Sequence, residues 1–214
     1  MQNVVPAAAD RDPPVAERLA SRTLSLRSEA YADEVRRLVE AGYAVMRRTG
    51  SLEPRVNDIV REAGLSNQAF YRHFRSKDEL LVAILDEGRR QLVTYLEHRM
   101  AGATTAEARV RAWVRGVMEQ ARNAAAAENT RPFAINSARL ADQFPDEVAR
   151  SRELVVRPLR AAVAEAGGDP QCDADAVYHL AIGCMNDALV ARQQPSRDDV
   201  DHLEKFAVGG LRGT

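Results

Sequence analysis

Several polar side chains stand close together between positions 67 and 77 of the sequence. The set consists of Asn67, Gln68, Tyr71, Arg72, His73 and Lys77. Asparagine and glutamine can form two hydrogen bonds with adenine, and arginine can do the same with guanine. Tyrosine, histidine and lysine can donate hydrogen bonds to phosphate oxygens, which fixes the position of a protein along a duplex. The set therefore indicates a surface that contacts both the base edges and the backbone of double-stranded DNA.

A rigid pair of helices is needed to hold these side chains, and the surrounding sequence predicts one. Apolar residues at helical spacing predict a helix over residues 55–63 and a second helix over residues 67–74. Between them, Gly64 can take a positive φ and end the first helix, and Ser66 can cap the second. Two short helices joined by a three-residue turn are typical of a helix-turn-helix.

Two phenylalanines are expected to hold the second helix in place. Phe70 and Phe74 are four residues apart, which puts them on one face of a helix. An apolar stripe predicts a longer helix over residues 28–48, against which this face can pack. The sequence Ser76-Lys77-Asp78-Glu79 fits a capping box, and it predicts the start of another helix whose free N–H groups can bind phosphate.

The charge of this region differs from that of the whole chain. The 214 residues carry a formal net charge of −1, with 30 Lys and Arg against 31 Asp and Glu. From Tyr43 to Lys77 there are seven cationic and three anionic residues, so this stretch carries +4. The balanced total excludes DNA binding through global charge alone, whereas the local excess favours contact with a polyanion.

The remainder of the chain predicts only helices. Residues 1–25 hold three prolines and no sustained apolar period, and we expect them to form a flexible arm. Helical periods then continue toward the C-terminus, and no alternating β pattern of useful length is found. The helices expected beyond the helix-turn-helix span residues 76–100, 106–126, 131–142, 145–166, 173–192 and 196–209.

Three short stretches resemble the DNA-binding region of the tetracycline-repressor-like (TetR) family. They are Asp58-Ile59-Val60-Arg61-Glu62-Ala63-Gly64-Leu65-Ser66, Phe70-Tyr71-Arg72-His73-Phe74 and Ser76-Lys77-Asp78-Glu79-Leu80-Leu81. The similarity extends from Val35 to Leu85, and beyond it only the length and the all-helical layout are similar. The resemblance implies an all-α fold with a three-helix DNA-binding domain over residues 26–76. A helical ligand-binding and dimerisation domain would then occupy residues 77–214.

The resemblance also implies roles for individual positions. Phosphate-contacting positions of the family are occupied here by Tyr71, His73 and Lys77, and base-facing positions by Asn67, Gln68 and Ala69. Asn57 matches a position on the preceding helix that can reach the DNA. Arg55 stands where the family usually has a threonine that starts this helix and contacts phosphate. Arginine cannot cap the helix in the same way, but it can still reach a phosphate.

The last two predicted helices carry apolar stripes with several small residues, which would let another helix approach closely. Two such helices from each of two chains can form a four-helix bundle, or the stripes can pack inside one chain. A dimer would double the contacts of a short recognition helix on a palindromic site. The expected dimer interface consists of Val177, Leu180, Ala181, Cys184, Ala188, Val200, Leu203 and Phe206.

A pocket in the helical domain is implied by the resemblance alone. Its candidate lining residues are Trp113, Met118, Phe133, Asn136, Phe144, Tyr178 and Met185, each of which can equally be ordinary core or surface. The expected effector is a small apolar or amphipathic molecule that releases a repressor from its operator. The alternative is a DNA-binding protein of the same fold that acts without a small-molecule ligand.

Other function classes find little support in the sequence. The chain has no nucleophile elbow, phosphate-binding glycine loop or HExxH motif, so we expect no enzyme. Cys172 and Cys184 have no cysteine or histidine pair at zinc-ligand spacing, so we expect no metal or cofactor. The N-terminus lacks a signal-peptide pattern, and no apolar run is long enough for a membrane helix, so we expect a cytoplasmic protein. A further hypothesis places Arg11, Arg18 and Arg22 of the arm in a minor groove.

Overall fold

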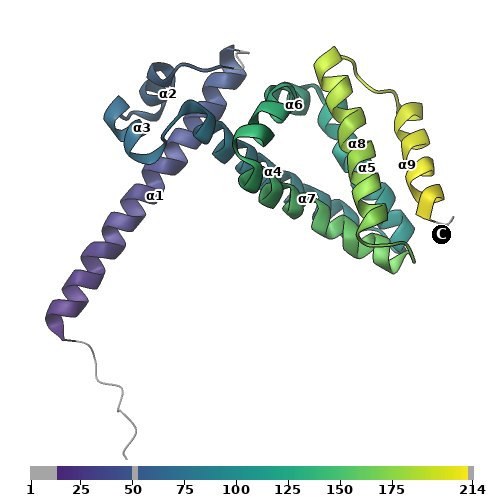
Figure 1. Cartoon of the computed structure of the whole chain (residues 1–214), viewed down its shortest axis with the longest axis horizontal. Helices are drawn as coiled ribbons and strands as arrows, with labels where there is room; N and C mark the ends of the chain where they lie inside the picture. The colour runs from purple at the N-terminus through teal and green to yellow at the C-terminus, as the bar shows by residue number, and fades with distance from the viewer. Residues whose placement is uncertain (1–13, 50–52, 212–214) are drawn as a thin grey trace, which may run out of the picture.

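The computed structural model describes residues 14–49 and 53–211, which form nine helices and no strand. The helices are α1 (Val15–Thr49), α2 (Val56–Ala63), α3 (Asn67–His73), α4 (Lys77–Ala101), α5 (Ala106–Arg122), α6 (Ala124–Gln143), α7 (Pro145–Glu165), α8 (Cys172–Ala191) and α9 (Arg197–Leu211). α2 and α3 lie beside the second half of α1, and α4 leads from them into a bundle of the remaining helices (Figure 1). The all-α class predicted from the sequence is confirmed. None of the described helices is both long and apolar enough to cross a bilayer.

The buried side chains form two cores. The N-terminal core joins α1, α2, α3 and the start of α4, and it contains Leu38, Ile59 and Phe70. The C-terminal core joins the rest of α4 with α5, the start of α6, α7, α8 and α9, and it contains Trp113 and Leu159. Each core buries the apolar faces that the helical periods of the sequence predict.

α4 connects the two cores as one continuous helix. Its first turns bury Leu80 and Ile84 in the N-terminal core, and its later turns bury Val93 and Leu96 in the C-terminal core. A helix of this length spans about 37 Å, at roughly 1.5 Å per residue. Because the helix is a rigid element packed at both ends, a shift at one end displaces the side chains at the other.

The predicted domain boundary between residues 76 and 77 falls inside the N-terminal core. Leu80 and Leu81 follow that boundary and pack in the same core as Phe70, together with Leu140 of α6. The helix-turn-helix therefore takes part of its core from the segment that the sequence assigned to the helical domain.

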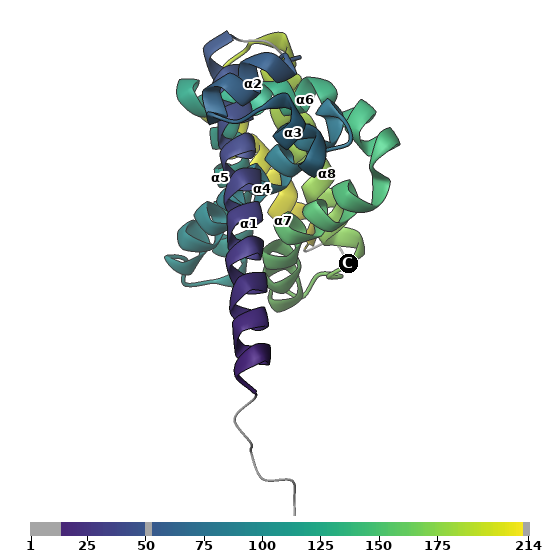
Figure 2. The same ribbon diagram turned by 90° about the vertical axis from the view of Figure 1, so that its left-hand side faces the viewer.

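α1 begins at Val15, well before the start at residue 28 that the sequence predicted. Its first half projects away from the rest of the protein, and Leu19, Leu24 and Leu26 are exposed there (Figures 1 and 2). The packed second half of α1 provides the helix nucleus. Each residue of the exposed first half then adds a backbone hydrogen bond to the existing helix, even though its side chain is not buried. The expectation of a flexible arm is therefore wrong for residues 15–25, and residues 1–13 lie outside the described part.

This helix also corrects the hypothesis of a minor-groove arm. Arg18 and Arg22 lie on turns of α1. A helix with its side chains is about 10–12 Å across, whereas the minor groove of B-DNA is about 6 Å wide. These two arginines therefore cannot enter a minor groove as an extended arm does, and Arg11 lies outside the described residues.

The break between α5 and α6 lies earlier than predicted. Asn123 ends α5 and caps α6, because its Oδ1 accepts a hydrogen bond from the backbone N–H of Ala126 at 3.0 Å. α6 then continues through residues 128–130, which the sequence predicted as a turn, and through Pro132. The hydroxyl of Thr130 donates to the carbonyl of Ala126 at 2.8 Å, so this polar residue bonds within the helix instead of ending it.

Candidate nucleic-acid interface

The turn between α2 and α3 has the geometry that its residue types require. Gly64 takes the left-handed conformation, with φ 63° and ψ 35°, and ends α2. The N–H of Leu65 bonds back to the carbonyl of Val60 at 2.8 Å. Ser66 caps α3, since its Oγ accepts a hydrogen bond from the N–H of Ala69 at 3.1 Å. These contacts fix the direction in which α3 leaves the turn.

Two phenylalanines anchor the inner side of α3. Phe70 is fully buried and Phe74 nearly so, and both pack in the N-terminal core with Leu38 of α1 and Leu80 of α4. Their ring centroids lie 5.6 Å apart. Burial of each such side chain contributes about 1.5–3 kcal/mol relative to exposure. The short helix is therefore held by its neighbours rather than by its own seven residues.

The opposite side of α3 is polar and open to solvent. Asn67, Gln68, Tyr71 and Arg72 are all exposed and lie at positions that share one side of a helix, which we call the outer face of α3. Tyr71 leaves 61% of its surface exposed. Ala69 lies on the inner side at only 6% exposed, so the base-facing role predicted for it must be corrected.

Glu34 of α1 binds two of the residues that the sequence assigned to DNA contact. Its Oε2 accepts a hydrogen bond from Arg72 and lies 2.6 Å from Nε2 of His73. Tyr31, one helical turn earlier, places its ring centroid 5.6 Å from that of His73 and 5.4 Å from the guanidinium carbon of Arg72. The hydrogen bonds with His73 and Arg72 lower the pKa of the Glu34 carboxyl. We call Tyr31, Glu34, Arg72 and His73 the Glu34 cluster.

The Glu34 cluster bears on the phosphate contact predicted for His73. In the cluster the His73 side chain is nearly buried and faces Glu34, so a phosphate contact requires its release. Sequence reasoning missed Tyr31 and Glu34 because they stand more than thirty positions before Asn67 in no recognisable motif. Only the packing of α1 against α3 brings them to the interface.

α2 contributes to the same surface. Nδ2 of Asn67 donates to Oδ1 of Asn57 at 2.9 Å, and both residues are exposed. Arg55 precedes α2 and is exposed, and its side chain does not cap the helix, as expected for arginine. Figure 2 looks onto this side of the molecule, where α2 and α3 lie in front of the second half of α1.

The start of α4 lies next to α3 in the chain and offers a second anchor for phosphate. Ser76 caps α4, because its Oγ accepts from the N–H of Glu79 at 3.1 Å, as predicted. The Glu79 carboxylate accepts from the N–H of Arg75 at 2.5 Å. Lys77 occupies the first helical position and pairs with Glu53, with Nζ 3.3 Å from Oε2. The positive charge of Lys77 therefore lies at the positive end of the helix dipole, and both attract phosphate.

A comparison with known families identifies this region. Residues 38–84 match the family described as "Bacterial regulatory proteins, tetR family". Residues 38–84 of the chain are therefore a tetR-family segment. The matched residues comprise the last third of α1, all of α2 and α3, and the start of α4, which together carry the DNA-binding helix-turn-helix.

Solved structures of similar fold cover most of the chain. A TetR transcription regulator from Haloarcula marismortui is 18% identical, with 86% of this chain and 98% of that chain covered and a TM-score of 0.65. FadR from Bacillus subtilis in complex with stearoyl-CoA is 15% identical, with coverages of 83% and 97% and a TM-score of 0.61. RolR in complex with resorcinol is 13% identical, with coverages of 86% and 89% and a TM-score of 0.63. At these identities the likeness shows the shared fold.

The predicted ligand-binding residues are distributed over both cores. Trp113, Met118, Tyr178 and Met185 are buried in the C-terminal core, whereas Phe133 and Phe144 pack against the N-terminal core. The expectation that all seven line one pocket must therefore be corrected. The aromatic and methionine pattern predicted burial, but it did not predict which core each residue joins.

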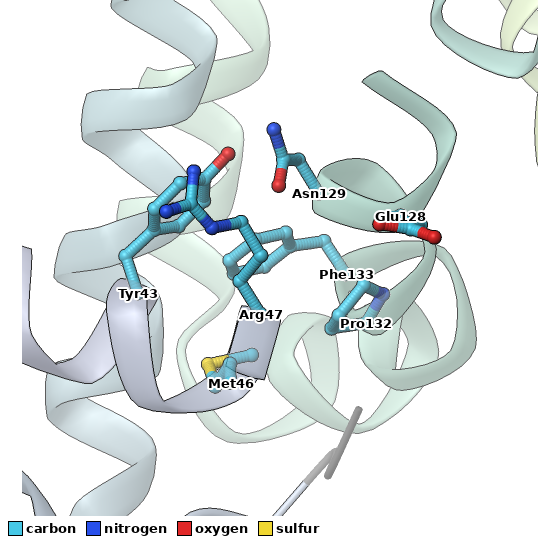
Figure 3. Close-up of a pocket in the computed structure, with 7 residues that line it drawn as sticks. All are labelled: Tyr43, Met46, Arg47, Glu128, Asn129, Pro132 and Phe133. Carbon is cyan, nitrogen blue, oxygen red and sulfur yellow. The ribbon is translucent and has the colours of Figure 1, made fainter. Parts of the chain in front are cut away.

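Phe133 lies instead at a hollow between α1 and α6. The hollow is shallow and open to solvent, and it is lined by Tyr43, Met46, Arg47, Glu128, Asn129, Pro132 and Phe133 (Figure 3). Asn136 follows on α6, where its amide donates to the carbonyl of Pro132 and accepts from Arg139. Asn136 is therefore engaged within its own helix.

Half of the predicted dimer-interface residues are used inside the single chain. Val177, Ala181, Val200 and Leu203 are buried in the C-terminal core. α8 and α9 both pack against α5, so the apolar stripes on them cover their own bundle. These four must be removed from the expected interface. The remaining four are Leu180, Cys184 and Ala188, which are partly buried, and Phe206, which is 65% exposed.

Proposed function

We propose that this chain is a transcriptional repressor that binds a palindromic DNA operator as a homodimer and is released by a small-molecule effector. The observation that carries the proposal is the outer face of α3, a row of exposed polar side chains on a helix anchored by Phe70 and Phe74. Such a helix suits the major groove of B-DNA, which is about 12 Å wide. Binding to chromosomal DNA would place the protein in the bacterial cytoplasm.

Within this proposal the exposed side chains divide into two roles. Asn67 and Gln68, at the start of α3, contact base edges, as the N-terminal residues of recognition helices do. The phosphate contacts come from Arg55, Tyr71 and Lys77, whereas Glu34 restrains Arg72 and His73, which add phosphate contacts only when Glu34 no longer binds them. Asn57 supports Asn67 through the hydrogen bond between their side chains.

Substitutions of Gln68 and Tyr71 should affect DNA binding differently. Gln68→Ala removes a base contact and should relax discrimination at one base pair by about 1–3 kcal/mol. Tyr71→Ala removes a phosphate contact and should weaken all duplexes alike. The measurement is a gel-shift titration on a palindrome selected from random duplexes, with unrelated duplex as competitor.

Lys77→Ala and Gln143→Ala complete this experiment. Loss of the Lys77 contact should reduce the slope of log affinity against log salt by about one. Gln143 is exposed at the end of α6, and its substitution should change nothing. If unrelated duplex competes for the protein as effectively as unlabelled palindrome does, sequence-specific binding is contradicted.

The outward side of α8 and α9 supports the homodimer. Phe206 is exposed on α9, and a Cβ added at Gly209 or Gly210, in the following turn, would meet no atom within 4 Å. A protruding aromatic beside glycines allows a second helix to approach closely. A dimer formed there would carry two recognition helices, which must lie about 34 Å apart to enter successive major grooves.

Phe206→Glu should convert the dimer into a monomer, because it places a charge at the centre of the proposed interface. Light scattering should then report the chain mass of 23.6 kDa instead of twice that value. Leu24→Glu is the matched control, since Leu24 is equally exposed at 65% but lies on the projecting half of α1. A dimer that survives Phe206→Glu but not Leu24→Glu would place the interface on α1 instead.

A small-molecule effector is supported by two of the similar structures. FadR was solved with stearoyl-CoA and RolR with resorcinol. In this chain α4 packs in both cores, so it can transmit a movement in the C-terminal core to the helix-turn-helix. To release DNA, an effector must bind the conformation that cannot bind DNA more tightly than the one that can, since equal affinity shifts nothing.

A further inference from the structure

A partly buried arginine lies inside the bundle where α4 faces α7. The Arg89 guanidinium donates to the backbone carbonyl of Val148 at 3.0 Å. A guanidinium carries five N–H donors, so this bond leaves most of them without a protein acceptor. Within the described ranges Arg89 forms no ion pair, since Asp86, one turn before it, pairs with Arg90 at 2.8 Å. Arg89 is thus a cation without a close counter-charge.

The α7 turn beside Arg89 holds two more donors without partners. Val148, Ser151 and Arg152 stand three and four residues apart, which puts them on one face of the helix. Ser151 is only 2% exposed, and its Oγ has no hydrogen-bond partner among the described residues. The same holds for the buried Nε of Arg152. Buried polar groups without partners are costly and rare, so these two donors beside the Arg89 guanidinium point to an absent acceptor.

α8 supplies an aromatic surface next to these donors. The guanidinium carbon of Arg152 lies 4.6 Å from the ring centroid of Tyr178. Tyr178 in turn lies 6.3 Å from Trp113, centroid to centroid, and both rings are buried in the C-terminal core. Cationic donors on one side and aromatic rings on the other match the two ends of an amphipathic molecule.

The local charges leave Arg89 uncompensated. Burial lowers the pKa of the Arg89 guanidinium, and Arg152 acts in the same direction, while Tyr178 and Asp86 oppose them. Arg152 has its own counter-charge in Asp175, at 3.1 Å. Arginine remains protonated under all these influences, so the positive charge persists in a poorly solvated place. A bound anion would offset the free-energy cost of this poorly solvated charge, and this would favour the liganded conformation.

We propose that Arg89, Ser151 and Arg152 form an anion site, which takes the carboxylate or phosphate group of an amphipathic effector. The apolar part of that effector lies toward Tyr178 and Trp113. Arginine binds both kinds of anion through paired charge-assisted hydrogen bonds, and the serine hydroxyl supplies a further donor. The inference rests on the proposed function, because it names the chemistry of the molecule that the repressor senses.

Four eight-carbon probes that differ only in the head group test the proposal on the full chain without DNA. They are octanoate, octyl phosphate, 1-octanol and octylamine. Trp113 is the one tryptophan of the sequence, so its emission reports events at this site, and the thermal midpoint rises with binding by mass action. At least one of the two acidic probes should bind at least about tenfold more tightly than octanol. Octylamine should bind more weakly than octanol.

Two substitutions of Arg89 separate recognition from folding. Arg89→Met removes the charge, and Arg89→Gln removes the charge but keeps a donor for Val148. Both should lose the preference for acidic head groups, and Arg89→Met without ligand should unfold no earlier than the wild type, because an uncompensated charge is gone. Arg157→Gln is the control, since Arg157 is exposed on α7 and forms only a long ion pair, 3.9 Å, with Glu97. It should keep the preference.

The proposal is overturned if neither acid binds better than octanol, or if both Arg89 variants keep the wild-type preference. Because no DNA is present, either result leaves operator binding to be judged by the gel-shift titration. A failed gel shift likewise leaves the anion site standing.

Discussion

Replacing Phe70 with alanine should strongly destabilise the helix-turn-helix and weaken DNA binding. Phe70 is fully buried in the N-terminal core, and truncating such a side chain costs about 3–5 kcal/mol. That is a large part of a typical domain stability of about 5–15 kcal/mol. For a chain of this size the thermal midpoint should fall by about 6–20 °C, since each kcal/mol lowers it by about 2–4 °C. Circular dichroism at 222 nm during heating is the measurement.

Tyr71 is the matched control, because it is the next residue and also aromatic. Its centroid lies 5.2 Å from that of Phe70, yet 61% of its surface is exposed. Tyr71→Ala should keep the midpoint within about 2 °C, as surface substitutions do, while losing DNA affinity. If both variants lowered the midpoint equally, the division of α3 into an inner and an outer face would be wrong.

The features that the sequence predicted correctly are those set by local chemistry. Gly64 ends α2 with a positive φ, and Ser66 and Ser76 cap the helices that follow them. Each of these depends on a residue type and on neighbours within four positions, so the sequence is sufficient. Phe70 also faces inward as its helical spacing predicts.

The features that the sequence could not predict depend on which helices meet. The apolar stripe of α8 was visible, but only the packing on α5 shows that Val177 and Ala181 are covered by their own chain. Phe133 and Trp113 both looked like lining for one pocket, yet they belong to different cores. Periodicity identifies a buried face without naming its partner, and this is why the predicted interface and pocket needed correction.

Tertiary packing also created the Glu34 cluster, whose role a single substitution can test. Glu34→Gln should raise the affinity for any duplex while lowering discrimination between duplexes. The carboxylate neutralises Arg72 and holds it beside Tyr31, and glutamine keeps the shape without the charge. A freed Arg72 can contact one more phosphate, which should steepen the slope of log affinity against log salt by about 0.9. Because the guanidinium is then no longer oriented, cognate and unrelated duplexes should differ less.

The matched control is Asp33→Asn at the adjacent position. Asp33 is exposed and pairs with Arg36 at 3.0 Å, so its substitution removes the same charge without freeing a residue of α3. The control should therefore leave both the salt slope and the discrimination near their wild-type values. A Glu34→Gln variant that weakened every duplex with an unchanged salt slope would show that Glu34 holds α3 in its active position and does not restrain Arg72.

Titration of Glu34 provides an independent check, because its carboxyl pKa is lowered in the folded chain by His73 and Arg72. A lowered pKa means that the ionised form stabilises the fold. The contribution is fully present above the ordinary carboxyl pKa and is lost as the pH falls through the lower folded value. The thermal midpoint of the wild type should therefore exceed that of Glu34→Gln at neutral pH, and the difference should shrink in acid. A difference that persisted unchanged at low pH would mean that the charge of Glu34 does not hold α1 and α3 together.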